Sequence, residues 1–280
     1  MAAKMTLSFN KKNPVILIIL IIGVSFASSN LQSGDSFYSL RAENAHGNMV
    51  KDKNIKEAIK HYSLALKEPQ AREEAAWKLL RAYYFLGCFA TPNDKERYNV
   101  FEKARAEGKA FWKEFPKNLD VAYWYSVNLA LWARSVNPLR ALNAGSVSDT
   151  REIARMLIAQ GHNKEAVARG HQILGRAHQV LPRMVVVLNW VNRDSVEHHY
   201  KKALSLNQND IATRLFLADF YKDRKRNQEF EAILKPALQA KPRPEEYLED
   251  ERNLLKMKRL LSDPKFSEFK QHQTNLENAD

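Results

Sequence analysis

Aromatic side chains of one segment could bind an apolar or ring-containing ligand. Tyr125, Leu129 and Trp132 are spaced by four and three residues, which places them on one face of a helix with Asn128 beside them. One interpretation is core packing between neighbouring helices. The other is a groove or pore lined by rings, in which Asn128 and Arg134 supply polar contacts. If the second holds, replacing Trp132 by alanine weakens binding more than it lowers stability.

Two further segments carry rings that allow similar alternatives. Trp77 and Tyr84 lie in a second aromatic stretch, where core packing again competes with a binding face. Trp190 lies in the continuously apolar run from Met184 to Val191. This run predicts a buried connection or an early start of the next helix. Its alternative is an apolar flap that lines a ligand channel or a subunit contact.

Five histidines fall within one stretch: His162, His171, His178, His198 and His199. His171 and His178 share a helix face, but seven residues correspond to about 10 Å of rise, too far for two ligands of one ion. His198 and His199 are adjacent and face apart on a helix. We therefore expect no metal site and no cofactor.

Sequence patterns typical of catalysis are absent. There is no Gly-x-Ser-x-Gly elbow, no glycine-rich phosphate loop and no His-Glu-x-x-His motif. Cys88, the single cysteine, has apolar neighbours and no nearby base, so it is interpreted as a small buried residue. The sequence predicts a binding protein and not an enzyme.

The first residues predict export. Lys11 and Lys12 precede an apolar run from Val15 to Val24 that ends in small residues, as in a secretory signal peptide, with cleavage expected after Ala27 or Ser29. A membrane span needs about 20 apolar residues, so an uncleaved inner-membrane anchor is the alternative. No cysteine follows the run, so a lipoprotein is not expected. We expect a periplasmic protein.

Composition favours a helical fold with a real core. The chain of 280 residues is 45% hydrophobic, yet it has only 9 glycines and 10 prolines, too few for the many turns of a β-sandwich. The net charge of +12 would suit nucleic acid. However, basic and acidic residues are interleaved, which favours a solvated helix surface, so nucleic acid is not an expected partner.

A repeated pattern of small and bulky residues indicates helical hairpins. Its four copies each end near a Pro or an Asn, and each is followed by a new amphipathic helix. Small residues let paired helices approach closely, and Pro or Asn ends the helix. The copies are Ala58-Tyr62-Ala65, Ala104-Gly108-Phe111, Val196-Tyr200-Ala203 and Phe230-Leu234-Ala237.

The spacing of these copies is uneven. Ala65 and Phe111 are 46 residues apart, whereas Ala203 and Ala237 are 34 apart, the tetratricopeptide (TPR) period. A degenerate unit is expected over 119–165, with Thr150 as a helix N-cap. Inserts are expected at 91–97 and 136–149.

The pattern predicts an all-α, TPR-like solenoid of about four to five repeats over residues 50–263. Residues 1–29 are assigned to the signal peptide or anchor, 30–49 to a linker and 264–280 to a C-terminal tail.

Four ordered blocks resemble the TatT family, the TPR-type T components associated with some TRAP transporters. They are residues 75–87 (AAWKLLRAYYFLG), 122–132 (AYWYSVNLALW), 171–182 (HQILGRAHQVLP) and 200–204 (YKKAL). The resemblance covers about residues 50–263. The chain departs from the family in lacking the lipidation cysteine of several relatives and in replacing the usual Asp-Pro helix ends.

The resemblance implies a periplasmic homotrimer with a pore in each protomer. It also implies a partnership with the substrate-binding protein of a TRAP transporter and an apolar or organic-acid ligand. We expect a periplasmic accessory component of such a transporter. The alternative is a generic TPR scaffold for protein–protein interaction in the cell envelope.

Overall fold

The computed structural model describes residues 28–181 and 189–262. Over these residues the fold is all-α, as predicted, with one isolated β-bridge between His46 and Met49. Twelve α-helices and one 3₁₀ helix (η2, Pro244–Glu246) make up the described part. In chain order the α-helices are α1 (Ser29–Ser39), α2 (Lys53–Ala65), α3 (Arg72–Phe89), α4 (Asp94–Glu114), α5 (Leu119–Arg134), α6 (Pro138–Asn143), α7 (Ser146–Ile158), α8 (Lys164–Val180), α9 (Ser195–Leu206), α10 (Ile211–Asp223), α11 (Asn227–Ala237) and α12 (Tyr247–Leu261).

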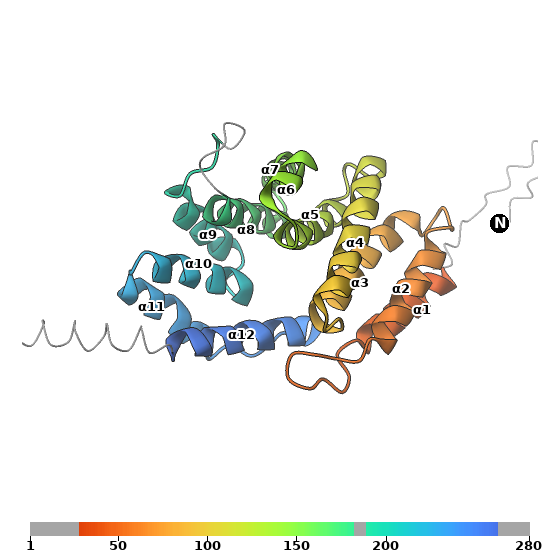
Figure 1. Ribbon diagram of the computed structural model, residues 1–280, viewed down its shortest axis with the longest axis horizontal. Helices are drawn as coiled ribbons and strands as arrows, with labels where there is room; N and C mark the ends of the chain where they lie inside the picture. Colours follow the sequence, from red (N-terminus) through yellow and green to blue (C-terminus); the bar gives the residue numbers. More distant parts are fainter. Residues whose placement is uncertain (1–27, 182–188, 263–280) are drawn as a thin grey trace, which may run out of the picture.

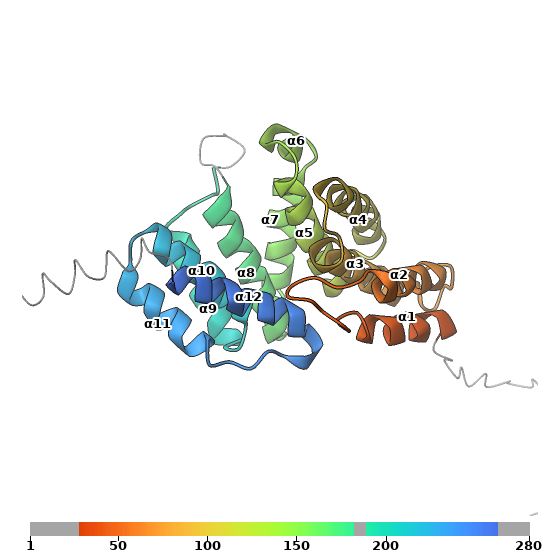
Figure 2. The same cartoon turned by 60° about the horizontal axis from the view of Figure 1, so that its bottom comes forward.

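Successive helices pack as antiparallel hairpins, stacked one upon the next (Figure 1). The first helices of the hairpins, here called the A helices, are α1, α3, α5, α8 and α10; their partners, the B helices, are α2, α4, α7, α9 and α11. The short helix α6 lies between α5 and α7. The hairpins form an arch, and α12 runs across its open side from the α10–α11 end toward α1 (Figures 1 and 2).

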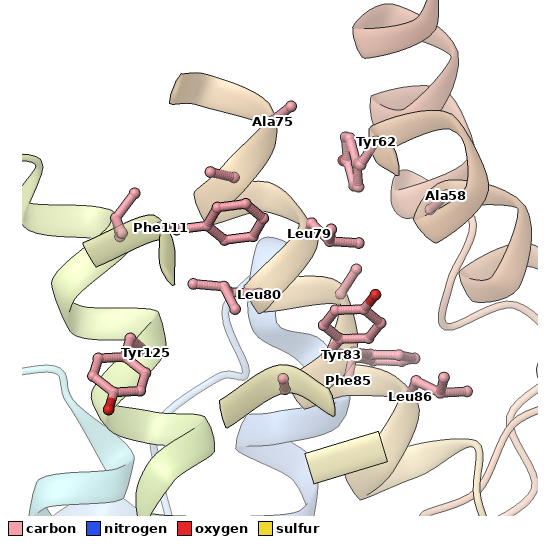
Figure 3. Close-up of a cluster of buried hydrophobic side chains, with 14 of the residues drawn as sticks. Ala58, Tyr62, Ala75, Leu79, Leu80, Tyr83, Phe85, Leu86, Phe111 and Tyr125 are labelled. Carbon is pink, nitrogen blue, oxygen red and sulfur yellow. The ribbon is translucent and has the colours of Figure 1, made fainter. Parts of the chain in front are cut away.

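The predicted repeat pattern falls on four of the B helices. Ala58, Tyr62 and Ala65 of α2 are fully buried, and the matching positions of α4, α9 and α11 are buried as well. Figure 3 shows how α3 lies between α2 and the α4–α5 pair, with Leu79 on the Tyr62 side and Leu80 on the Tyr125 side. The solenoid prediction is therefore confirmed.

Close helix approach depends on glycine at a few positions. A Cβ atom placed on Gly108 of α4 would lie 2.7 Å from the ring of Tyr125. One on Gly34 of α1 would lie 2.5 Å from the ring of Tyr62. Both distances are shorter than a carbon–carbon contact allows, so each glycine lets a tyrosine ring lie flat against the neighbouring helix.

Asparagine is the N-cap of four helices, α4, α5, α6 and α8. The side chains of Asn93, Asn118, Asn137 and Asn163 each accept a hydrogen bond from the backbone N–H three residues on. An N-cap of this kind satisfies one of the free amides of the first turn and fixes where the helix begins. The hairpin boundaries thus follow from local chemistry.

Two local predictions differ from the structure. The expected linker over 30–49 contains α1, which packs on α2; Leu31 and Tyr38, seven residues apart, are buried on one face. Helix α7 begins at Ser146 and not at Thr150, because Gly145, with φ of +76°, ends the preceding turn. Thr150 instead donates its hydroxyl to the carbonyl of Ser146. The run from Met184 lies outside the described residues up to position 188.

The buried side chains form two clusters. The N-terminal core extends from α1 to α7 and includes Leu248 of α12. The C-terminal core is formed by α9, α10, α11 and the later part of α12, with Leu254 and Met257. Helix α12 therefore contributes to both. None of the helices in the described ranges is long and apolar enough to cross a membrane.

Candidate functional site

Guanidinium groups stack on aromatic rings along the A helices of the first two hairpins. The Cζ atoms of Arg41 and Arg81 lie 4.3 and 4.1 Å from the centroid of the Tyr38 ring. Arg81 also lies 4.9 Å from the ring of Trp77, and Arg41 lies 5.2 Å from that of Phe85. Each contact is within the range of a cation–π interaction.

The same kind of contact continues into the next A helices. Tyr84 of α3 lies 5.4 Å from Trp124 of α5, centroid to centroid, and Trp124 lies 5.2 Å from Tyr123. Arg169 of α8 is placed 4.3 Å over the Tyr123 ring. We call this set the arginine–aromatic face; its members are Tyr38, Arg41, Trp77, Arg81, Tyr84, Tyr123, Trp124 and Arg169.

Helical spacing explains why α3 contributes three of these residues. Trp77, Arg81 and Tyr84 occupy positions i, i+4 and i+7, which project from one side of a helix. All three side chains are half-buried, whereas their neighbours Leu79 and Leu80 point into the core. On α3, the face is thus the part of the helix that the hairpin core leaves uncovered.

The tyrosines of the face remain neutral at physiological pH. Burial raises the pKa of Tyr123 to about 12, although the guanidinium of Arg169 acts in the opposite direction. Burial also raises the pKa of Tyr84 well above its ordinary value. Both rings nevertheless retain accessible surface. Their hydroxyls can therefore act as neutral hydrogen-bond donors, beside guanidiniums that are always charged.

Several buried polar atoms near α12 have no hydrogen-bond partner among the described residues: Nε of Arg41, Arg81 and Arg252, and Oε2 of Glu249. Arg41 is only 7% exposed, so the unpaired state of its Nε carries a real cost. Such donors suit an anionic group, because a guanidinium pairs best with a carboxylate or a phosphate.

The predicted site residues divide into two groups. Trp77 and Tyr84 belong to the arginine–aromatic face. Tyr125, Asn128 and Trp132 are at most 1% exposed and belong to the N-terminal core, so core packing, the first of the two interpretations, accounts for their burial. The two groups lie on different sides of the A helices.

Each buried residue of the second group has a specific partner. The Tyr125 hydroxyl donates to Asp149 Oδ2 at 2.6 Å, and Lys109 Nζ donates to the same oxygen at 3.0 Å. The Asn128 amide donates to the backbone carbonyls of Leu80 and Trp124. The Trp132 indole donates to the carboxylate of Glu102. These bonds tie α5 to its neighbours and leave no side-chain surface for a ligand.

Arg134 and Trp190 lie apart from the face. Arg134, the last residue of α5, is exposed. Trp190 is half-buried; its ring lies 5.3 Å from that of His178, and Arg151 of α7 lies 5.2 Å over it. Trp190 thus belongs to a histidine cluster.

Three histidines meet where α8 packs on α9. Nδ1 of His171 lies 2.9 Å from Nδ1 of His199, and the His178 and His199 rings stack at 5.2 Å. The backbone N–H of Asn192 donates to Nδ1 of His178 at 3.1 Å. Burial and neighbouring positive groups lower the pKa of all three, that of His199 to about 4. The cluster is therefore neutral at pH 7.

Spacing along α8 does not reveal this cluster, because His199 of the partner helix fills the space between His171 and His178. In the described ranges, no group of three or more His, Cys, Asp or Glu side chains could hold a metal ion. Cys88 is half-buried, and burial raises the pKa of its thiol, with Arg252 acting in the opposite direction. A thiol in this state is a poor nucleophile.

The arginine–aromatic face was missed as a unit by sequence reasoning. Tyr38 and Arg41 lie in the segment that was interpreted as a linker, and Arg169 is contributed by an A helix two hairpins after α3. Arginine four residues from tryptophan on one helix, as in Trp77 and Arg81, is the local signal that could have indicated it.

Comparisons with known proteins support the fold. No family model and no curated protein matches the chain. Among solved structures, the chain is similar to a thermophilic TPR protein of Thermus thermophilus, with 21% sequence identity and a TM-score of 0.53. The similarity covers 81% of this chain and 97% of the Thermus chain. The chain is thus a TPR-like, all-helical repeat protein.

Proposed function

We propose that the protein binds a partner protein through the arginine–aromatic face. The observation that carries this proposal is the face itself: two groups of stacked rings and guanidiniums, contributed by α1, α3, α5 and α8 and the turn after α1. Its members on α3, α5 and α8 are half-buried. Arginine, tyrosine and tryptophan are the residues that dominate binding energy at protein interfaces. Nothing in this function requires a catalytic step.

The proposed partner is the periplasmic substrate-binding subunit of a TRAP-type transporter. The support for it is the ordered resemblance of residues 75–87, 122–132, 171–182 and 200–204 to TatT proteins, together with the export signal expected in residues 1–29. In this role the protein is a periplasmic accessory component, assembled as a trimer, that holds the binding subunit and takes up its apolar or organic-acid ligand.

The proposal is tested by native mass spectrometry of the mature protein with TRAP substrate-binding subunits of the same organism. A complex at micromolar concentrations that is weakened at least tenfold by Trp77→Ala is the expected result. The matched control is Leu139→Ala, because Leu139 is 67% exposed and lies on α6, which contributes no residue to the face. The absence of any complex with the unaltered protein would contradict the TRAP assignment.

A generic envelope scaffold is the second function considered, and the repeat fold favours it equally. The two differ in what is bound besides protein. A small apolar or carboxylic ligand that co-purifies with the protein would favour the transporter role, whereas an array that binds only protein would favour the scaffold.

A further inference from the structure

Helix α12 connects the two ends of the arch. Leu248, near its start, is 2% exposed and packs in the N-terminal core, whereas Met257, near its end, is fully buried in the C-terminal core. The segment that leads into α12 thus reaches residues about 200 positions earlier in the chain, as the hydrogen bond from the Arg41 guanidinium to the backbone carbonyl of Glu245 shows. Figure 2 shows α12 crossing in front of the hairpins.

The start of α12 is acidic and lies against the arginine–aromatic face. We define residues 244–252, which are η2 and the first residues of α12, as the acidic half of α12; its acidic residues are Glu245, Glu246, Glu249, Asp250 and Glu251. Arg41 donates to the carbonyl oxygen of Glu245 and lies 3.9 Å from the carboxylate of Glu249. The face thus already holds an acidic helix that belongs to the same chain.

A second contact fixes the end of the acidic half on α3. Arg252 lies 4.0 Å over the ring of Phe89, and its Nη1 donates to the carbonyl of Cys88 at 3.3 Å. Cys88 therefore lies under the acidic half of α12. The contact depends on one hydrogen bond to a backbone oxygen and on one stacked ring.

The polar contacts of the acidic half are incomplete. The Arg41–Glu249 pair is long at 3.9 Å, although both side chains are almost fully buried. Glu249 Oε2 has no hydrogen-bond partner among the described residues, and Nε of Arg41 and of Arg252 have none either. Burial raises the pKa of Glu249 despite the nearby guanidinium of Arg41. Asp250 is fully buried and accepts three hydrogen bonds, but all come from Arg243, which immediately precedes the same segment. Buried charges that are only partly paired stabilise little, so the contact of this end of α12 with the N-terminal core depends mainly on Leu248.

By contrast, the later half of α12 is anchored by apolar contacts. Leu254 and Met257 pack into the C-terminal core with Phe230 and Leu234 of α11 and the aromatic residues of α10. Release of the acidic half therefore leaves α12 attached at its other end.

From this geometry we infer that the acidic half of α12 is an internal occupant of the partner-binding face, and that the partner docks with a helix of the same chemistry. That helix presents a leucine beside carboxylates, and it displaces residues 244–252 when it binds. This inference rests on the proposed function in one respect only, namely that the face binds a protein.

The first test uses Cys88 as a reporter, because it is the only cysteine of the chain. The rate at which an alkylating reagent modifies Cys88 measures how often the acidic half leaves α3. Leu248→Ala should accelerate the modification at least tenfold. Leu255→Ala is the matched control, since Leu255 lies on the same helix but is exposed, and it should leave the rate unchanged.

Hydrogen exchange of the Leu248→Ala variant distinguishes local release from general unfolding. Amides of α3 and α5 should keep their protection, while those at the start of α12 lose it. Loss of protection throughout α3 would overturn the inference, and so would an unchanged rate of Cys88 modification.

The second test supplies the displaced segment in trans. A fluorescent peptide of residues 244–261 is titrated against the Leu248→Ala variant and against unaltered protein. At least tenfold tighter binding to the variant is expected, and a scrambled peptide of equal charge should not bind either. Failure of the native peptide to bind the variant would overturn the inference. Dimers that exchange α12 would assign the face to a second copy of the chain and would also overturn it.

A locked form separates this inference from the proposed function. Arg252→Cys, linked to Cys88 by a short bismaleimide, holds the acidic half in place, and the same variant without the linker is its control. The linker should reduce peptide binding and binding of the substrate-binding subunit at least tenfold. If the subunit binds locked and unlocked protein equally, the inference fails while the proposed function stands. If the subunit binds neither but the peptide prefers the unlocked protein, the TRAP assignment alone fails.

Discussion

The N-terminal and C-terminal cores are built from the same repeat but pack by different means. In the N-terminal core, rings lie against glycines: Tyr62 on Gly34, Phe101 on Gly87 and Tyr125 on Gly108. The C-terminal core has one such contact, of Tyr200 on Gly175, and the sequence has no glycine after residue 175, so helices α10 to α12 pack through alanine, branched and aromatic residues. Contacts of a ring with a glycine are therefore concentrated in the N-terminal hairpins.

The two halves also differ in how deeply the acceptors of their polar contacts are buried. In the N-terminal half, Asp149 is buried and accepts from both Tyr125 and Lys109, which joins α4, α5 and α7. In the C-terminal half, the comparable acceptor is Glu197, which is partly exposed and receives Arg226 and Tyr221. Arg226, by its hydrogen bonds, lowers the pKa of Glu197 to about 2.

This difference implies unequal local stability. In a repeat array each hairpin contacts only its neighbours, so stability is distributed along the chain and is not shared by a single core. We expect the first three hairpins to be the last part to open. The α8–α9 hairpin, which carries the histidine cluster, is the junction between the two halves.

The largest effect is expected in the N-terminal core. Trp132→Ala removes a side chain that is 1% exposed and hydrogen-bonded to Glu102, and should lower the free energy of unfolding by about 3–5 kcal/mol. Urea unfolding followed by circular dichroism measures it. A small loss of stability with a large loss of partner binding would instead place Trp132 at a binding surface and break the comparison.

Truncation in the C-terminal core should have a more local effect. Leu234 of α11 is fully buried, and Leu234→Ala should cost about 2–4 kcal/mol. Hydrogen exchange should show lost protection in α9 to α12 and little change in α2 to α5. Equal loss in both halves would mean that the cores unfold as one unit.

Acidification should weaken the junction. The pKa of His199 is about 4 in the folded chain and about 6.5 when the chain is unfolded, so the unfolded state binds more protons below pH 6.5. Stability present at pH 7.5 is therefore lost as pH falls through this window, by about 1 kcal/mol at pH 5.5 for this residue.

Among the described residues, the other groups that act on the cluster are His198 and Lys202 of α9 and Arg151 of α7, and each disfavours added positive charge. His199→Phe keeps a ring in the stack and should flatten the dependence of stability on pH between 7.5 and 5.5. An unchanged slope in this variant would show that other groups control the junction.

The smallest effect is expected at the surface of the stable half. Arg72 and Glu114 form a two-point ion pair between α3 and α4, but both side chains are about 40% exposed. Solvent screens such a pair, so Glu114→Gln should change the free energy of unfolding by less than about 1 kcal/mol, as measured in urea. A larger loss would mean that surface pairs, and not close ring packing, distinguish the two halves.

The hairpin pattern was predictable because each B helix carries its own signal. Ala58, Tyr62 and Ala65 mark a buried face by spacing alone, and Asn118 marks a helix start by its capping chemistry. Helix α1 lacks such a signal, because it is rich in serine and contains Gly34, a residue that disfavours a helix. In the structure, Gly34 is needed because the ring of Tyr62 packs against it.

The site was less predictable because its parts come from distant segments. Trp77 and Tyr84 could be named from their helix, but nothing local indicates that Arg81 of α3 stacks on Tyr38 of α1 or that α12 returns to α3. The histidine cluster illustrates the same limit, since His199 reaches the cluster from a different helix than His171. Contacts of this kind depend on how hairpins stack, which single-helix periodicity does not contain.

The positions of the tryptophans determine which half of the molecule can be followed by intrinsic fluorescence. All five tryptophans lie at or before residue 190, so intrinsic indole emission reports the N-terminal hairpins and the junction, while opening of α10 and α11 leaves it unchanged. Trp190 lies 5.3 Å from His178, and a protonated imidazole quenches a neighbouring indole. Emission from Trp190 should therefore decrease on acidification before the emission of the other four tryptophans changes. Intrinsic fluorescence can thus be used to follow protonation at the junction.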